Sequence, residues 1–548
     1  MKKIHFLFIL FFGFQSLSAQ ETFTRKDSLH GGLRPERTCF DVLRYDLNIK
    51  VNPSEKSIVG YNDITFKVIE NTNKIQLDLF ENMKVDSIVF KSKKMNYTRE
   101  FGAVFINFTS PLSQSSEEYK IRFYYSGNPL IAKHAPWDGG FVYSKDANGK
   151  DWIGVAVQET GASLWFPCKD SQTDEPDLGA TIKVAVPNGL MNVSNGRFIG
   201  SVPITFGIKN GYTRWDWEVK NPINNYDITL NIGDYVHFGE NYKGLDLDYY
   251  VLRENEAKAK IQFKQVKPMM DCFQSKFGIY PFADDGYKLV ETAYLGMEHQ
   301  SAVSYGNQFK NGYVGHDLSG TGIGLNFDFI IIHESGHEWF GNSITSKDIA
   351  DMWIHEGFAM YSESVFIECQ NGYEKALQYI NGLKQNVRND SPIIGKYSVN
   401  HKGSDDMYPK GALLLNTLRH VINDDTKWWK LLYDYSNTFR HQIIDTEMVV
   451  AFFNQRSGLN LAPIFNQYLR YSSIPFLEIK RNKKNIEYRW ISDVQDFNMP
   501  IDILLNGKKI RINPTTSWSI SNFKITKLSK IEVLKNEFFI NDKIYCNK

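Results

Sequence analysis

Apolar and polar residues alternate with a period of two through much of the first half of the chain. Residues 45–51, 64–68 and 75–79 carry an apolar side chain at every second position, and turn-forming residues separate the three runs. This alternation predicts half-buried β-strands. Because similar runs continue to about position 234, we expect residues 22–235 to form one all-β domain of sandwich or saddle type.

The period becomes helical from about Glu254 onwards. Apolar side chains there recur every three or four residues, which is typical of amphipathic helices. The predicted helical stretches are residues 255–276, 325–340, 351–369, 372–388, 410–422 and 446–455. We therefore expect residues 236–475 to form a second, mostly helical domain.

The two-residue alternation returns near the C-terminal end. Ile486, Tyr488 and Trp490 alternate with polar residues, and Asn506-Gly507 follows another alternating run as a strong hairpin signal. Residues 476–548 are therefore predicted to form a small β-sandwich. The fold class expected for the whole chain is multidomain α+β, with β domains on either side of a mostly helical one.

Composition and charge narrow the class of protein. The chain has 548 residues, of which 42% are hydrophobic and 14% aromatic, so it can fill more than one sizeable core. The formal net charge is only +1 at pH 7. Since a near-neutral chain has no general attraction for polyanions, we expect no nucleic-acid partner.

The N-terminus has the pattern of a secretion signal. Lys2 and Lys3 precede an apolar run at positions 6–14, and small and polar residues follow up to Ala19. We assign residues 1–19 to this signal peptide. The apolar run is too short to span a bilayer, and no later segment is long and apolar enough to do so. We expect an exported protein, periplasmic or extracellular, without stable membrane insertion, and the oligomeric state is left open.

Cysteine usage is sparse for an exported protein. The five cysteines are scattered and form no Cys-x-x-Cys pair: Cys39, Cys168, Cys272, Cys369 and Cys546. This spacing predicts neither a disulfide framework nor a second metal site. One disulfide and a set of mostly buried free thiols are equally compatible with the sequence.

The candidate chemistry is concentrated in His333-Glu334-Ser335-Gly336-His337 and in Glu356, with eighteen residues between His337 and Glu356. On a helix, residues four apart lie about 6 Å along the axis and nearly above one another. His333 and His337 can therefore present imidazole nitrogens to one ion. Residues 353–363 form a second predicted helix that carries Glu356.

This set of side chains predicts a catalytic zinc site. Two neutral imidazoles and one carboxylate leave the fourth position of a tetrahedral Zn²⁺ open, which distinguishes a catalytic from a structural site. An open position binds a water whose proton Glu334 can take. We expect one Zn²⁺ per chain, held by His333, His337 and Glu356. A fortuitous match is the competing interpretation, but the helix-compatible apolar residues before the motif argue against it.

Several motifs around this segment resemble one family. The matching segments are Trp339-Phe340-Gly341-Asn342, Trp353 to Ala359, Phe277 to Phe282, Gly296-Met297-Glu298, Tyr408-Pro409-Lys410-Gly411-Ala412 and Trp165-Phe166-Pro167-Cys168. They are similar to the gluzincin zinc aminopeptidases related to aminopeptidase N and leukotriene hydrolase. The likeness covers most of residues 40–475 and implies a thermolysin-like catalytic domain.

The resemblance implies that Glu298 binds the free α-amino group of a peptide substrate, within the substrate-binding motif that Gly296 and Met297 begin. A carboxylate at a fixed distance from the metal pairs with an ammonium only at a chain end. The resemblance also implies that Gln158 lies near the pocket for the first residue and assists amine recognition. A surface glutamine at a strand end is the competing interpretation.

The resemblance further implies that Tyr408 donates a hydrogen bond to the tetrahedral oxyanion. One oriented donor of this kind contributes about 3 kcal/mol to catalysis. A buried core tyrosine is the alternative. Glu363 lies two turns beyond Glu356 and could orient a ligand histidine, as carboxylates often do in zinc sites. An ordinary exposed helix glutamate is the competing interpretation there.

The chain departs from the family pattern near the proposed amine-binding residue. Leu295 and His299 stand where many members have glycine and asparagine, which affects the substrate contacts and hence the specificity. His355 and Glu338 replace frequent asparagine and glutamine beside the ligands. We expect neither His299 nor His355 to bind metal. The chain also ends before the large helical domain of many relatives, so we expect a short form with a more open site.

The function expected from the sequence is an exported zinc aminopeptidase that removes N-terminal residues from peptides. Glu334 would activate water, Tyr408 would stabilise the oxyanion and Glu298 would anchor the amine of a peptide with a free N-terminus. Two alternatives remain at this point. One is a zinc endopeptidase with the same site, and the other is a catalytically inactive relative that binds peptides or a partner protein.

Overall fold

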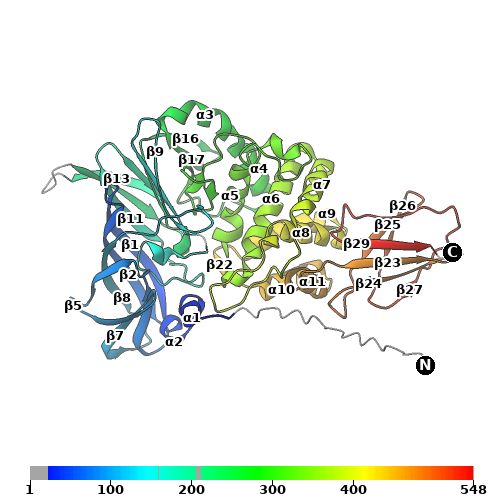
Figure 1. The fold of residues 1–548 in the computed structure, drawn as a ribbon, viewed down its shortest axis with the longest axis horizontal. Helices are drawn as coiled ribbons and strands as arrows, with labels where there is room; N and C mark the ends of the chain where they lie inside the picture. Colours follow the sequence, from blue (N-terminus) through cyan, green and yellow to red (C-terminus); the bar gives the residue numbers. More distant parts are fainter. Residues whose placement is uncertain (1–21, 158, 205–210, 547–548) are drawn as a thin grey trace, which may run out of the picture.

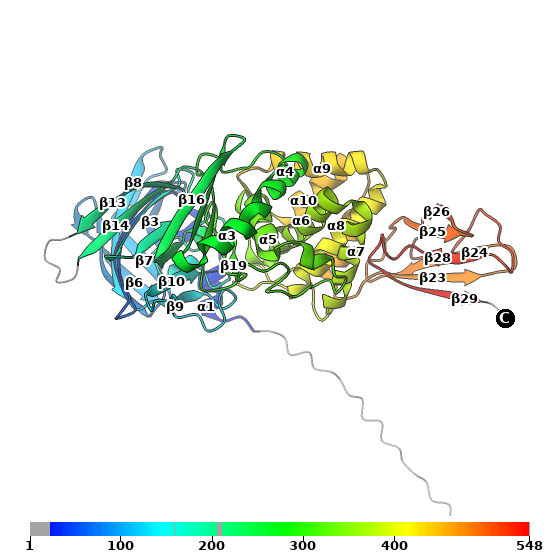
Figure 2. The same cartoon turned by 90° about the horizontal axis from the view of Figure 1, so that it is seen from above.

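The structure, a computed structural model, describes residues 22–157, 159–204 and 211–546. A β-rich N-terminal region, a helical middle region and a smaller C-terminal β region follow one another along the long axis of the molecule (Figures 1 and 2). This arrangement confirms the multidomain α+β fold class. The predicted signal peptide, residues 1–19, and Gln158 lie outside the described residues.

The N-terminal region is built on an eight-stranded sheet. β1 and β2 form its central antiparallel hairpin, and β1 also pairs in parallel with β11. In spatial order the strands are β13 (Arg197–Ile204), β14 (Tyr212–Val219), β11 (Ala180–Pro187), β1 (Phe40–Asn52), β2 (Ser57–Val68), β8 (Glu118–Gly127), β4 (Met83–Phe90) and β5 (Lys93–Lys94).

Two smaller sheets share a core with this large sheet. The first contains β12 (Met191–Ser194), β15 (Leu230–Gly233), β10 (Asp151–Ala156) and β9 (Gly140–Lys145), and the second contains β3 (Thr72–Asp78), β7 (Ala103–Leu112) and β6 (Asn96–Glu100). Ile49, Ile75 and Ile232 come from the three different sheets and are buried in one apolar cluster. The alternation read from the sequence is therefore the alternation of core and outer faces.

A mixed five-stranded sheet links the β-rich region to the helices. Its spatial order is β16 (Tyr235–Tyr242), β17 (Leu245–Leu252), β18 (Tyr287–Glu291), β20 (Val303–Tyr305) and β19 (Gly296–Met297). β19 is the edge strand and pairs antiparallel with β20. Because Glu298 directly follows β19, this edge positions the residue expected to bind the substrate amine.

The middle region contains the predicted helices and two that the sequence reading did not include. The α-helices are α3 (Glu256–Gln262), α4 (Val266–Phe277), α5 (Phe329–Gly336), α6 (Trp353–Asn371), α7 (Tyr373–Gly382), α8 (Pro409–Ile422), α9 (Asp425–Thr438), α10 (Thr446–Ser457) and α11 (Ala462–Arg470). α9 and α11 were missed. The helix predicted at 325–340 is shorter, because a π-helical turn at Glu338–Asn342 with Gly341 at φ +135° follows α5.

Glycines let the helices of the middle region approach closely. A Cβ atom on Gly336 of α5 would lie 2.4 Å from Ser362 Oγ of α6. On the other side of α6, a Cβ on Gly411 of α8 would lie 2.8 Å from the Cα of Gly357. No side chain fits at such distances, so these positions set the spacing of α5, α6 and α8.

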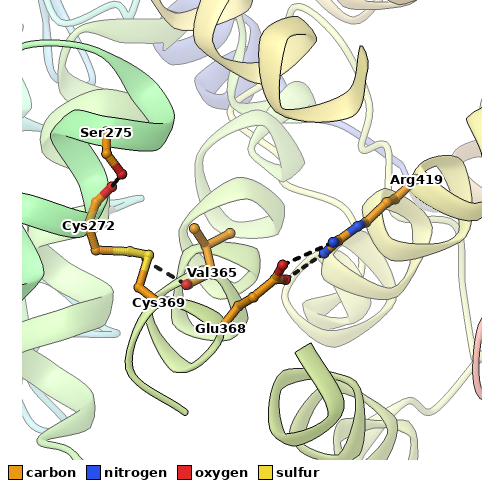
Figure 3. Close-up of a disulfide and its surroundings, with 6 residues drawn as sticks. All are labelled: Cys272, Ser275, Val365, Glu368, Cys369 and Arg419. Carbon is orange, nitrogen blue, oxygen red and sulfur yellow. Dashed lines mark hydrogen bonds and ion pairs between the residues drawn. A yellow bond between two sulfur atoms is a disulfide. The ribbon is translucent and has the colours of Figure 1, made fainter. Parts of the chain in front are cut away.

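A disulfide joins α4 to the C-terminal end of α6. Cys272 and Cys369 are bonded, with Cα atoms 6.0 Å apart and a sequence separation of 97 (Figure 3). Beside it, Glu368 of α6 forms a bidentate ion pair with Arg419 of α8, the shorter contact being 2.6 Å (Figure 3). The end of α6 is therefore fixed from two sides. The other two cysteines whose side chains are described, Cys39 and Cys168, are buried free thiols.

The C-terminal region consists of two small sheets packed on the helices. The first contains β27 (Ser519–Ile520), β24 (Ile486–Ile491), β23 (Phe476–Arg481) and β29 (Asn541–Cys546), and the second contains β26 (Lys508–Ile512), β25 (Ile501–Leu505) and β28 (Ile531–Val533). Asn506 and Gly507, both at positive φ, connect β25 to β26 and confirm the predicted hairpin. The region shares one apolar core with the helices. Across the described part of the chain, no helix combines the length and apolarity needed to cross a membrane.

Candidate active site

The two histidines of the motif lie on one face of α5. Asp328 caps the helix by accepting hydrogen bonds from the backbone N–H groups of Ile330 and Ile331. One turn separates His333 from His337, and their Nε2 atoms lie 3.3 Å apart. Both rings are buried, so the pair is presented to the interior of a cleft rather than to bulk solvent.

Glu356 completes the cluster from the first turn of α6. Its Oε2 lies 3.5 Å from His333 Nε2 and 3.3 Å from His337 Nε2. A tetrahedral zinc ion with ligands at about 2.0–2.1 Å places its ligand atoms roughly 3.3–3.4 Å apart. The three distances between the ligand atoms of this cluster agree with that spacing. The donor set of two imidazoles and a carboxylate suits zinc. The residues present therefore fit the ion.

Each ligand histidine is oriented through its second ring nitrogen. His333 Nδ1 donates to Glu363 Oε1 at 2.7 Å, and the hydroxyl of Tyr379 donates to Glu363 Oε2 at 2.6 Å. His337 Nδ1 donates to the carbonyl of Phe340 at 3.0 Å. These bonds leave both Nε2 atoms as acceptors toward the cluster. Glu363 thus occupies the orienting position considered from the sequence and is not an exposed glutamate.

Glu334 and Glu298 lie together beside the ligands. Oxygens of the two carboxylates and a ring nitrogen of His337 all lie within 4.8 Å of one another. Burial is the main cause that raises the pKa of Glu334, to about 7, and it also raises the pKa of Glu298. Such a value suits a group that takes and returns a proton near neutral pH.

Glu298 is held by its backbone rather than by its side chain. The side-chain amide of Asn342 donates to the Glu298 carbonyl at 2.6 Å. The whole residue is 1% exposed, and Oε1 of its carboxylate has no hydrogen-bond partner among the described residues. A buried acceptor without a partner is costly and is typical of a position that receives a ligand.

Gly296 allows the edge strand β19 to approach α5. A Cβ atom at this position would lie 2.7 Å from Glu334 Oε1 and 2.9 Å from a side-chain carbon of Ile330. A side chain there would displace the Glu334 carboxylate. Met297, the next residue of the strand, is buried and borders the same cavity.

Tyr408 immediately precedes α8 and contacts the cluster. Its hydroxyl donates to Glu356 Oε1 at 2.9 Å, and its ring stacks on His333 with centroids 6.2 Å apart. Burial raises the pKa of Tyr408 well above its usual value, so the hydroxyl keeps its proton. The residue is therefore a hydrogen-bond donor at the ligand cluster, not a tyrosine of a remote core.

The cluster opens into a cavity of about 420 Å³. Residues of α5 and α6, the strand with Met297 and Glu298, and the segment around Tyr408 border this cavity. Pro136 and Trp137 of the N-terminal region also border it, and Trp137 is 51% exposed. The β-rich region therefore covers one side of the site. The volume is in the range typical of small-ligand sites.

Three of the residues that depart from the family pattern, His299, His355 and Glu338, are buried but remain outside the ligand cluster, whereas Leu295 is half-buried and borders the cavity. His299 Nδ1 lies 3.0 Å from Ser304 Oγ, and His355 Nε2 accepts a hydrogen bond from the backbone of Ser346. Burial lowers the pKa of each histidine to about 3. Glu338 accepts hydrogen bonds from the Ser301 backbone and the Tyr280 hydroxyl. All three substitutions thus have structural partners.

The structure brings most of the predicted site residues together. His333, His337, Glu356, Glu334, Glu298, Gly296, Met297 and Tyr408 all border the cavity. Gln158 lies outside the described residues, so its assignment stays a prediction. The sequence reading missed Trp137 and Arg388, which also border the cavity. No spacing or motif pointed to them, because each comes from a connection between elements.

A short helix with two histidine ligands, a third ligand on the following helix, and a buried glutamate between them define the gluzincin class of metal-dependent hydrolases. Comparison with known proteins narrows the class. The sequence model of the peptidase family M1 domain matches residues 262–468, and that of the peptidase M1 N-terminal domain matches residues 42–226. The chain belongs to the M1 peptidase family.

The relatives include proteins of different organisms and lengths. The chain is 24% identical over 315 residues to the endoplasmic reticulum aminopeptidase 1 of Mus musculus, covering 54% of this chain and 33% of that protein. It is 20% identical over 503 residues to the probable aminopeptidase 1 of Sulfurisphaera tokodaii, covering 86% and 59%. The chain thus spans about a third of the length of the first relative and less than two thirds of the second.

A solved structure shares the fold. The M1 zinc metallopeptidase of Deinococcus radiodurans superposes with a TM-score of 0.67 at 20% sequence identity. The match covers 81% of this chain and 95% of that one. The β-rich N-terminal region and the helical region therefore belong to an architecture already known for this family.

Proposed function

We propose that this protein is an exported zinc-dependent aminopeptidase that removes N-terminal residues from peptides. One Zn²⁺ per chain would be held by His333, His337 and Glu356. A zinc ion at this position supplies Lewis-acid polarisation of a carbonyl and makes a water more acidic. The family membership and the agreement of the ligand spacing with a tetrahedral ion support this assignment.

The position of Glu298 carries the proposal. Its buried carboxylate lies within the same small cluster as Glu334 and His337, and Oε1 has no partner among the described residues. An ammonium group is the natural occupant of such a position, because it supplies both charge and hydrogen bonds. Only the N-terminus of a peptide places an ammonium next to its first carbonyl. The site would therefore accept chain ends rather than internal bonds.

The other residues divide the chemistry between them. Glu334 takes a proton from the attacking water and returns it to the departing amine. Tyr408 keeps its proton and donates a hydrogen bond where negative charge develops on the carbonyl oxygen. Glu363 and the carbonyl of Phe340 keep the two imidazoles oriented while this occurs. Each role follows from an atom that already lies at the cluster.

A panel of aminoacyl reporter substrates tests the proposal. We expect hydrolysis that a chelator abolishes and that added zinc restores, with one equivalent of zinc per chain by elemental analysis. The panel also measures which first residue is preferred. A peptide and its N-acetylated form are then compared, and cleavage of the free amine alone is expected.

Two results would rule out the proposed aminopeptidase function and identify another one. Equal cleavage of both forms would identify a zinc endopeptidase. Stoichiometric zinc without hydrolysis of any free-amine substrate, with Glu334→Gln no different from the parent protein, would identify a peptide- or protein-binding relative.

Export rests on the N-terminal pattern and on the cysteine pairing. Cys272 and Cys369 form a disulfide, and such bonds persist mainly in oxidising compartments. Thiol trapping of the protein in its own cell should find these two cysteines oxidised, and fractionation should find the chain outside the cytoplasm. Reduced cysteines together with a cytoplasmic location would rule out this part of the proposal.

A further inference from the structure

One basic side chain borders a cavity that is otherwise acidic. Glu298, Glu334 and Glu356 contribute carboxylates to the cavity, and Arg388 is the only lysine or arginine among the described residues that border it. Neither the metal cluster nor the amine-binding position uses this arginine. Its charge has the same sign as the ammonium expected at Glu298, so the group that it attracts is an anionic one.

The backbone of Arg388 is firmly placed. Its N–H donates to Asp406 Oδ1 at 2.8 Å, and the N–H of Asn389 donates to Asp406 Oδ2 at 2.6 Å. Asp406 is 1% exposed and precedes Tyr408 by two residues. The segment that carries Arg388 is thus attached to the segment that carries the catalytic tyrosine.

The guanidinium group of Arg388 remains available for a ligand. Its side chain is 67% exposed and makes one long ion pair, 3.8 Å, with Asp405. Asp405 is itself 53% exposed and lies closer to Lys402, at 3.0 Å. Such an exposed and distant pair is weak. A carboxylate from a ligand would compete with it readily, because guanidinium binds carboxylate in a bidentate manner.

The expected position of the amine limits which carboxylates a bound peptide offers to Arg388. Arg388 borders the same cavity as Glu298, and its backbone is attached through Asp406 to the segment that carries Tyr408. A peptide with its amine at Glu298 and its first carbonyl at the cluster has its C-terminus and all later side chains after the bond to be cleaved. Apart from an acidic first side chain, every carboxylate of such a peptide therefore belongs to the leaving side.

We propose that Arg388 binds a carboxylate on the leaving side of the substrate. This inference rests on the proposed aminopeptidase function and adds a substrate class to it. A carboxylate there comes from the C-terminus of a short peptide or from an acidic side chain near the start of a longer one. An acidic and a basic side chain on one cavity match a short zwitterionic peptide.

Binding measurements on the zinc-loaded Glu334→Gln protein test the inference without relying on turnover. The probes are a dipeptide, a tripeptide and the same peptides with C-terminal amides, measured by calorimetry. The free acids should bind about ten-fold or more tightly than the amides, as expected for a charge-assisted pair. Adding Arg388→Gln should remove this preference, and Arg388→Lys should retain part of it.

A second series separates the two sources of the carboxylate. Longer peptides with C-terminal amides carry either glutamate or glutamine at the second or the third position. Preference for glutamate that Arg388→Gln removes would identify an acidic side chain as a ligand, whereas preference confined to short free acids would identify the C-terminus. Lys375→Gln, which removes an exposed cation of α7 outside the cavity, should leave every ratio unchanged.

Aminoacyl reporters distinguish failure of the inference from failure of the proposed function. They lack any carboxylate after the scissile bond, so Arg388→Gln in an otherwise unchanged protein should hydrolyse them at the parental rate. Equal binding of acids and amides by the parent site, or an equal loss for both in Arg388→Gln, would overturn the role of Arg388. Absence of reporter hydrolysis in the parent protein would overturn the proposed function instead, while the binding ratios still decide the inference.

Discussion

The ligand cluster and the proposed amine-binding position at Glu298 both contact α5. They differ in whether their polar atoms have hydrogen-bond partners in the protein. At the cluster, the outer nitrogen of each histidine has a protein partner, Glu363 for His333 and the Phe340 carbonyl for His337. At the other position, Glu298 Oε1 is buried without a partner among the described residues. The fold thus orients the proposed metal ligands in advance and leaves the acceptor proposed for the substrate amine without a protein partner among the described residues.

This difference has a thermodynamic reason. A metal site needs its ligand atoms at fixed positions, so hydrogen bonds to the second ring nitrogen are favourable before and after the ion binds. A substrate site gains affinity from groups that exchange an unfavourable buried state for a good hydrogen bond. Substitutions at the ligand cluster and at Glu298 should therefore have different consequences, and the following variants measure them.

The largest effect is expected for Glu334→Gln. Loss of the proton acceptor should lower kcat by about 10³-fold or more, within the range known for general base catalysis, while zinc content stays at the parental value. Steady-state assays with the best aminoacyl reporter and elemental analysis measure both. Glu374→Gln, an exposed glutamate of α7, is the control. Retention of activity by Glu334→Gln would show that another group takes the proton.

Tyr408→Phe should lower kcat by about 10²- to 10³-fold with little change in KM, because a donor to the developing oxyanion is lost only in the transition state. Pre-steady-state or steady-state assays separate the two constants. Tyr433→Phe, which alters an exposed tyrosine, serves as the control. Tyr408 also donates to Glu356. A loss of zinc affinity with normal kcat at saturating zinc would therefore show that Tyr408 supports the metal ligand Glu356 and does not stabilise the oxyanion.

Glu298→Gln should lower kcat/KM for free-amine peptides by about 10²-fold, since a charge-assisted hydrogen bond to the ammonium is replaced by a neutral one. Zinc affinity should not change, because Glu298 is not one of the three clustered ligands. Competition with a chelator measures the affinity. Equal losses of zinc and activity would contradict the distinction between the ligand cluster and Glu298.

The smallest effect is expected for Glu363→Gln. Its side chain still accepts a hydrogen bond from His333 but no longer provides a negative charge, so zinc affinity should fall by about 10-fold. Activity at saturating zinc should stay close to the parental value. Tyr379→Phe, which removes the donor to Glu363, should change affinity less. A fall in activity that excess zinc does not restore would place Glu363 in the chemistry itself.

The sequence predicted more of the cluster than of the proposed amine-binding position. The two histidines are one helical turn apart, and Glu356 follows on the next helix, so local geometry nearly suffices to bring them together. Glu298 was found only through a family resemblance. Arg388 and Trp137 were not found as site residues. The helix predicted at 372–388 was too long, because α7 ends at Gly382 and Arg388 lies in the connection that follows. Trp137 also lies in a connection between elements.

The fold, like the site, was predicted from the sequence only in part. Strand alternation and helical spacing identified the three regions, and the Asn506-Gly507 hairpin formed as predicted. α9 and α11 were missed although Trp428, Leu431, Leu432 and Tyr435 have helical spacing in α9. The short strands β18 to β20 were also missed, because runs of three to five buried residues do not reveal a period.

By itself the sequence determined the repeating patterns of burial, the local hairpin and the grouping of His333, His337 and Glu356, because each depends on residues close together along the chain. Only the tertiary structure decided which cysteines pair, which cavity carboxylate is buried without a partner among the described residues, and which arginine borders the cavity. These features join segments that are tens to hundreds of residues apart. Their distances are set by the packing of whole sheets and helices, which the order of residues does not display locally.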